Sequence, residues 1–157
     1  MTFAPLDHRG RPEQGLFFFE RRGYPGQKGK ATGMGFLVHP AGLVATASHV
    51  LITMGLIPGM DVTLYAGTEG GPVAVEARVL FEDQWRGPKW RGWVSESGSL
   101  AIPAFIPPEE YLEDLAVLQL LPAKAHAARN GQVMAPGKAT RLLEEYCRVL
   151  PLASPGF

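Results

Sequence analysis

His49 and Asp114 are the two residues of this sequence whose chemistry and context stand out. A histidine side chain changes its charge near neutral pH, so it can take up and release a proton during a reaction. An aspartate at the entrance to an apolar run costs free energy unless its carboxylate is hydrogen-bonded. A single histidine is more often packed or exposed than catalytic, and many strands begin with an exposed aspartate. The segments that position the two residues therefore decide whether they form a site.

Two apolar runs precede the histidine, at 35–38 and 43–47, and His39-Pro40-Ala41-Gly42 separates them. Proline and glycine favour a turn, so this stretch predicts a β-hairpin with His49 at the end of its second strand. Side chains alternate between the two faces of a strand, so Ser48 is expected to point away from the face that carries His49.

The aspartate opens a second apolar stretch, Asp114-Leu115-Ala116-Val117-Leu118-Gln119-Leu120, which predicts a buried strand over 114–121. The other strands are expected at 15–22, 61–66 and 73–81, the last two forming a second hairpin. In the last of these, Val73, Val75, Ala77 and Val79 share one face.

The glycine and proline content of the chain also favours short strands over long helices. It contains 19 glycines and 14 prolines, which suit tight turns. We expect an all-β fold, a six-stranded antiparallel Greek-key β-barrel with a long loop before the last strand. The spacing of Leu142, Leu143 and Tyr146 predicts a short helix over 138–147.

The segments around His49 and Asp114 resemble motifs of the trypsin-like serine peptidases, especially the bacterial Deg-type members. Gly33-Met34-Gly35-Phe36 is similar to their Gly-x-Gly-Phe strand, although the family usually carries Ser or Thr in place of Met34. The turn Pro40-Ala41-Gly42 and the segment Thr46-Ala47-Ser48-His49-Val50 follow the histidine motif. The segment from Asp114 to Leu120 is similar to the aspartate motif, Asp-Ile/Leu-Ala-Leu/Val-Leu-x-Leu/Ile.

The resemblance implies the first barrel of a double-barrel peptidase, with a Ser-His-Asp triad. His49 would act as general base toward a serine hydroxyl and then as general acid toward the leaving amine. Asp114 would hold the other ring nitrogen. We expect residues 1–14 to form an N-terminal arm, residues 15–121 the barrel, and residues 122–157 a connection toward a second barrel that this chain does not contain.

The family's nucleophile lies in a Gly-Asp/Asn-Ser-Gly-Gly motif that this sequence lacks. No serine of this chain fits the motif. Ser48 adjoins the histidine, Ser154 lies in the expected linker, and three serines of the long loop lack the motif's flanking glycines: Ser95, Ser97 and Ser99. Cys147, the single cysteine, excludes an intrachain disulfide and a multi-cysteine zinc site. The serine is thus expected in a C-terminal protease barrel, on the same precursor or on a separate chain.

Composition limits the other classes of function. The formal net charge is zero, so no overall field favours nucleic acid. The sequence lacks a run of about 18 apolar residues, which a membrane span needs, so no membrane contact is expected. It also lacks a signal-like N-terminus, so a cytoplasmic location is expected, or a secreted or periplasmic one if a leader has been removed. No histidine pair has zinc-motif spacing, and no cofactor or metal is expected. His8, His39 and His126 are expected on the surface.

The segment from Glu82 to Pro108 shows no period and reads as a long inserted loop. His49 and Asp114 are 65 positions apart, somewhat more than is usual in the family, and this loop would account for the excess. Its tryptophans, interleaved with Arg and Lys, could form a small core that pins the loop or could bind a partner: Trp85, Trp90 and Trp93.

The leading interpretation is therefore a trypsin-like serine endopeptidase acting on proteins or peptides. The alternative is an inactive or incomplete barrel that serves as a protein-binding module. An unrelated nucleic-acid-binding β-barrel is weaker, because the charge is balanced and the tryptophans gather in one loop.

Overall fold

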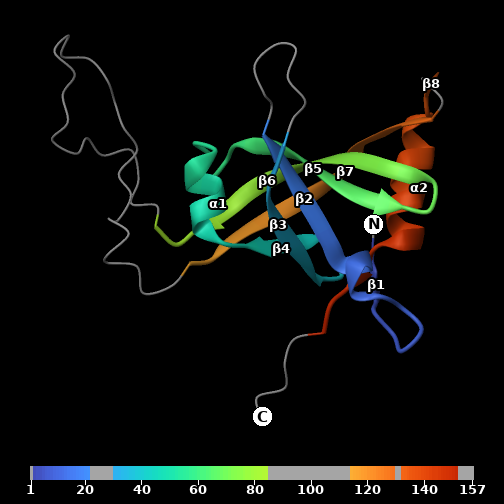
Figure 1. Ribbon diagram of the computed structural model, residues 1–157, viewed down its shortest axis with the longest axis horizontal. Coiled ribbons are helices and arrows are strands. Elements are labelled where there is room, and N and C mark those ends of the chain that lie inside the picture. The colour runs from blue at the N-terminus through green and yellow to red at the C-terminus, as the bar shows by residue number, and fades with distance from the viewer. Residues whose placement is uncertain (1, 22–29, 85–113, 130–131, 152–157) are drawn as a thin grey trace, which may run out of the picture.

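The computed structural model describes residues 2–21, 30–84, 114–129 and 132–151, and most of these lie in strands (Figure 1). In chain order the elements are β1 (Ala4–Pro5), η1 (Pro12–Gly15), β2 (Leu16–Arg21), β3 (Lys30–His39), β4 (Leu43–Thr46), α1 (Ser48–Thr53), β5 (Asp61–Thr68), β6 (Gly71–Glu82), β7 (Ala116–Arg129), β8 (Gln132–Val133), α2 (Pro136–Tyr146) and β9 (Arg148–Val149).

Six strands form a closed antiparallel barrel in the order β4-β3-β2-β5-β6-β7, and β7 pairs with β4 to complete the ring. The first three strands follow one another, and β5 then returns to lie beside β2, which is a Greek-key arrangement. The prediction of an all-β, six-stranded Greek-key barrel is confirmed.

The barrel interior follows from strand alternation. On β6, the predicted inward face of Val73, Val75, Ala77 and Val79 is buried. Phenylalanines of β2 and leucines of β3, β5 and β7 fill the same core, among them Phe17, Phe19, Leu37, Leu64, Leu118 and Leu120.

Two glycines of β3 explain how closely the histidine segment packs on the barrel. A Cβ atom on Gly35 would lie 2.5 Å from Cγ1 of Val44, so β4 could not approach β3 as it does. A Cβ atom on Gly33 would lie 2.8 Å from Cγ1 of Val50, the residue after the histidine. The Gly-x-Gly pattern therefore has a packing role: it lets α1 rest directly on β3.

The last barrel strand is longer than the sequence predicted. We expected a connection from Pro122 onward, but β7 continues to Arg129 and pairs with β6 through Ala125 and Ala127, both buried. The register shifts between Val75 and Glu76, where β7 carries extra residues that include the proline. Proline lacks an amide donor and is accommodated at such a bulge.

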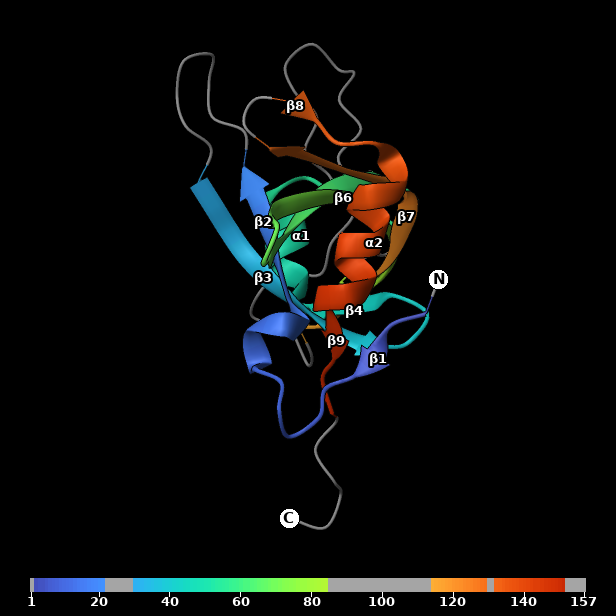
Figure 2. The ribbon, with the colours of Figure 1, turned by 90° about the vertical axis from the view of Figure 1, so that its right-hand side faces the viewer.

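Both ends of the described chain pack on the barrel. The predicted helix is confirmed as α2, which buries Ala139 and Leu143 and lies beside β7 (Figure 2). The N-terminal arm contains β1, which pairs in parallel with β9. Phe3, predicted to belong to the arm, is buried in the core. Neither described helix is long and apolar enough to cross a membrane.

Candidate functional site

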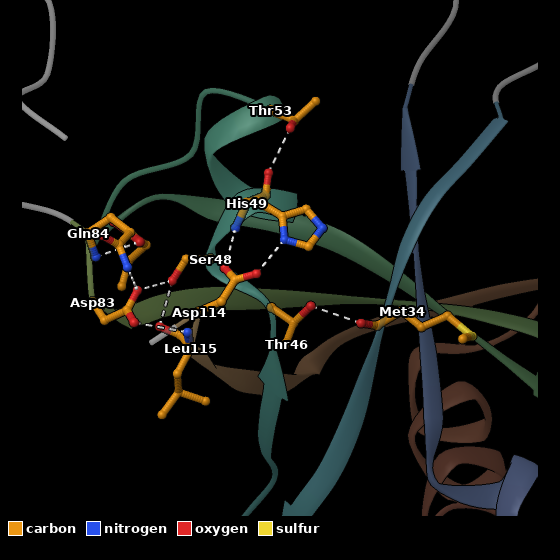
Figure 3. Close-up of polar contacts among 10 residues, drawn as sticks. Met34, Thr46, Ser48, His49, Thr53, Asp83, Gln84, Asp114 and Leu115 are labelled. Atoms are coloured by element: carbon orange, nitrogen blue, oxygen red, sulfur yellow. Dashed lines mark hydrogen bonds and ion pairs between the residues drawn. The ribbon is translucent and has the colours of Figure 1, made fainter. Parts of the chain in front are cut away.

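The histidine lies in a helix and not at the end of a strand. β4 ends at Thr46, and His49 belongs to the first turn of α1 (Figure 3). Two hydroxyl groups fix this turn: Thr46 Oγ1 donates to the Met34 carbonyl at 2.8 Å, and Thr53 Oγ1 donates to the His49 carbonyl at 2.7 Å. Ser48 was expected on a strand, and this was wrong: β4 ends at Thr46, and α1 begins at Ser48 after a single intervening residue.

His49 and Asp114 meet, although 65 residues separate them in the sequence. The ring Nδ1 lies 2.5 Å from Asp114 Oδ2, and the backbone N–H of His49 donates to Oδ1 at 3.0 Å. One carboxylate thus binds both the backbone and the ring of one residue, which fixes the ring's orientation. The two side chains are 65% and 40% exposed, so the pair lies at the surface.

The contacts with His49 and Ser48 also determine the protonation state of Asp114. Burial is the largest influence and raises the pKa of Asp114, but hydrogen bonds and charge from His49, with a backbone hydrogen bond from Ser48, outweigh it and lower the pKa below its usual value. The carboxylate therefore stays ionised at neutral pH. An ionised carboxylate can only accept, so Nδ1 carries the hydrogen and Nε2 is left to accept a proton.

A second polar cluster lies directly behind this pair, and it was not predicted from the sequence. The hydroxyl of Ser48 donates to Asp83 Oδ1 and also lies 2.8 Å from the carbonyl oxygen of Leu115. Leu115 in turn donates its N–H to Asp83 Oδ2 at 3.1 Å. Ser48 is fully buried, and these contacts occupy its hydroxyl, so Ser48 is no nucleophile for His49.

Glu82, at the end of β6, is a buried acid beside this cluster. Burial raises its pKa, and the charge of Asp83 adds to the rise, whereas the Gln84 amide and the Ser48 hydroxyl oppose it. The alternation of β6 did not predict a buried glutamate. The strand has a register shift between Val79 and Phe81, which inverts the alternation at its end, and the sequence carries no clear sign of this shift.

Glu82→Gln is expected to stabilise the protein near neutral pH. Folding raises the pKa of Glu82. The wild-type free energy of unfolding therefore falls as pH rises from the carboxyl's pKa in the unfolded chain through its pKa in the folded protein. Glutamine does not ionise, so the variant does not suffer this loss. Each unit of pKa difference corresponds to about 1.4 kcal/mol. Urea unfolding at acidic and neutral pH measures the difference, which should grow with pH.

The control for this change is Glu76→Gln on the same strand. Glu76 is more exposed, and its carboxylate lies 4.0 Å from Lys124 Nζ, so its loss should not stabilise the protein as pH rises. An advantage of Glu82→Gln that stays constant between acidic and neutral pH would contradict the assigned cause.

The remaining predicted site residues fall into three groups. Burial raises the pKa of the Cys147 thiol to about 12, so this side chain is not a nucleophile. The three other histidines are exposed as predicted: His8, His39 and His126. The tryptophans and remaining candidate serines lie outside the described residues: Trp85, Trp90, Trp93, Ser95, Ser97, Ser99 and Ser154. Within the described ranges, no cluster of three or more acidic, histidine or cysteine residues could hold a metal ion.

A separate cavity of about 680 Å³ opens beside β2, β5, β6 and β7. Its lining is mainly apolar and includes Phe18, Tyr65 and His126. Among the described residues that line it, there is no carboxylate, and neither His49 nor Asp114 is one of them. The cavity is therefore separate from the His–Asp pair.

Comparison with protein-family models, curated proteins and solved structures found no match to this chain. What the structure establishes is a closed six-stranded antiparallel barrel that presents an oriented His–Asp pair at its surface.

Proposed function

We propose that this chain is the first barrel of a trypsin-like serine endopeptidase and supplies two members of its Ser-His-Asp triad. The observation that carries the proposal is the 2.5 Å contact between His49 Nδ1 and Asp114 Oδ2, with the rest of the imidazole exposed. The two motifs on a Greek-key barrel, in the order that the family has them, support it further.

In the proposed reaction His49 moves the proton. Its Nε2 accepts the proton of a serine hydroxyl as the oxygen attacks the peptide carbonyl, and later gives that proton to the leaving amine. Asp114 holds the hydrogen on Nδ1, so that Nε2 is free to accept, and stabilises the positive ring that forms. The aspartate itself stays charged.

The serine and the donors that bind the oxyanion would come from a second barrel, in the same precursor or in a partner chain. Within the described residues Ser48 is the serine closest in sequence to His49, and its hydroxyl is already bound to Asp83 and Leu115. An incoming hydroxyl has open access, because the His49 side chain is 65% exposed. The substrate class is protein or peptide.

A fluorophosphonate probe tests the proposal on the complete natural product or on this chain joined with its partner. We expect labelling of a serine outside this chain and its loss in His49→Ala, because the probe requires an activated hydroxyl. His126→Ala, which removes an exposed histidine of β7, is the matched control and should label normally.

Three other results would count against the proposal or part of it. No labelling, or labelling that His49→Ala leaves intact, would refute the peptidase assignment. Peptide hydrolysis by residues 1–157 alone would refute the division of the triad between two barrels. An inactive barrel that binds other proteins is the alternative, and absence of a Gly-x-Ser-Gly-Gly motif in both the natural continuation and any partner would favour it.

A further inference from the structure

Two polar bridges join α1 to the segment that enters β7, and they run side by side. The first is the contact between His49 and Asp114. The second joins their chain neighbours, Ser48 and Leu115, through Asp83. Figure 3 shows the Ser48 hydroxyl and the His49 ring on opposite sides of the start of α1.

The second bridge is needed because sheet pairing stops short of the site. The last paired residues of β4 and β7 are Thr46 and Ala116, so no strand ladder holds the start of α1 against residues 114–115. Asp83 continues the pairing on the other side: its N–H donates to the Leu115 carbonyl at 3.1 Å, and its Oδ2 accepts the Leu115 N–H at 3.1 Å.

The carboxylate of Asp83 is itself held in place. Its Oδ1 accepts from Gln84 Nε2 at 2.9 Å as well as from the Ser48 hydroxyl. The Ser48 hydroxyl contacts this oxygen and the Leu115 carbonyl, and the carboxylate of Glu82 is a further hydrogen-bond neighbour. Ser48 therefore ties the first turn of α1 to a carboxylate that is anchored on both β6 and β7.

We propose that Asp83 is a positioning residue, which holds Ser48 against Leu115 and thereby keeps His49 at hydrogen-bonding distance from Asp114. Its importance for catalysis rests on the proposed function, whereas its effect on the histidine ring does not. A small movement of α1 away from residues 114–115 would lengthen a 2.5 Å contact that orients the ring. Asp83 binds Ser48 and Leu115, the chain neighbours of His49 and Asp114, so its action passes through these two residues.

The test is ¹⁵N NMR of the histidine ring in the whole chain, which reports the ratio of the Nδ1–H to the Nε2–H tautomer. In the wild type we expect Nδ1–H to dominate. Ser48→Ala and Asp83→Asn should each lower the ratio about tenfold, the effect of weakening one hydrogen bond to a charged group. Because the two residues act through one bridge, the double variant should fall no further than the more affected single variant.

Asp61→Asn is the control, since it removes a carboxylate whose ion pairs are with Arg78 and Lys124, outside the bridge of Ser48, Asp83 and Leu115. It should leave the His49 tautomer ratio unchanged. A wild-type ratio in folded Ser48→Ala overturns the proposal. Should Asp83→Asn fail to fold, Ser48→Ala alone decides, because alanine fits the buried site and removes one hydroxyl.

Failure of the proposed function gives a different result. In that case the tautomer ratio responds to Ser48→Ala while the complete product shows no fluorophosphonate labelling. If the product does label, Ser48→Ala should slow its labelling about tenfold, in step with the tautomer ratio.

Discussion

In the two-barrel peptidase that we propose, Asp114→Asn is expected to lower kcat about 10⁴-fold and to leave the fold intact. Asparagine has the same shape, and its side-chain oxygen can still accept the backbone N–H of His49. Its amide group, however, is a donor. Turned toward Nδ1, it favours the tautomer whose hydrogen lies on Nε2, and that tautomer cannot take a proton from serine.

Steady-state hydrolysis of a peptide substrate measures this effect, and the ring nitrogen spectrum confirms the tautomer. Asp61→Asn is the matched control, because its carboxylate binds Arg78 and not the histidine. A loss of less than tenfold in Asp114→Asn would show that the carboxylate has no catalytic part. Because folding lowers the pKa of Asp114, its carboxylate contributes to the free energy of unfolding at neutral pH. That contribution is lost only as pH falls through the lowered pKa.

Phe19→Ala is expected to lower the free energy of unfolding by about 3–5 kcal/mol. The Phe19 side chain is fully buried on β2, and its ring reaches within 3.6 Å of the position where Gly35 would carry a Cβ. The glycine leaves no side chain that could move in to fill the space. Removing the ring therefore leaves a cavity between β2, β3 and β4.

Phe18→Ala is the control for this change, since the neighbouring side chain points to the opposite face of the same strand and is 37% exposed. Urea unfolding of the two variants should separate them by at least about 1.5 kcal/mol, because an exposed ring has less apolar area to lose. Equal losses would contradict the assignment of Phe19 to the barrel core.

The barrel could be predicted because its strands carry local signals. The alternation from Val73 to Val79 and the apolar run after Asp114 each mark a strand. Proline and glycine at 40–42 mark the turn between two more. The identity of the His–Asp pair was also predicted, because each residue stands in a recognisable motif, and the structure brings the two together.

The missed features depend on contacts between distant segments. Alanine and lysine have weak strand preference, so the end of β7 becomes a strand only because β6 is available for pairing. Phe3 stands among polar residues, and its burial requires the core that the barrel provides. Asp83 gave no signal either, because its partners Ser48 and Leu115 are 35 and 32 residues away in the chain.

The pairing of β4 with β7 completes the ring, and it has a consequence for the newly made protein. His49 follows β4, and Asp114 precedes β7. In a chain whose β4 and β7 have not yet paired, the two residues are therefore not held in contact. In a hydrolase of the kind proposed, closure of the barrel would therefore be a requirement for activity.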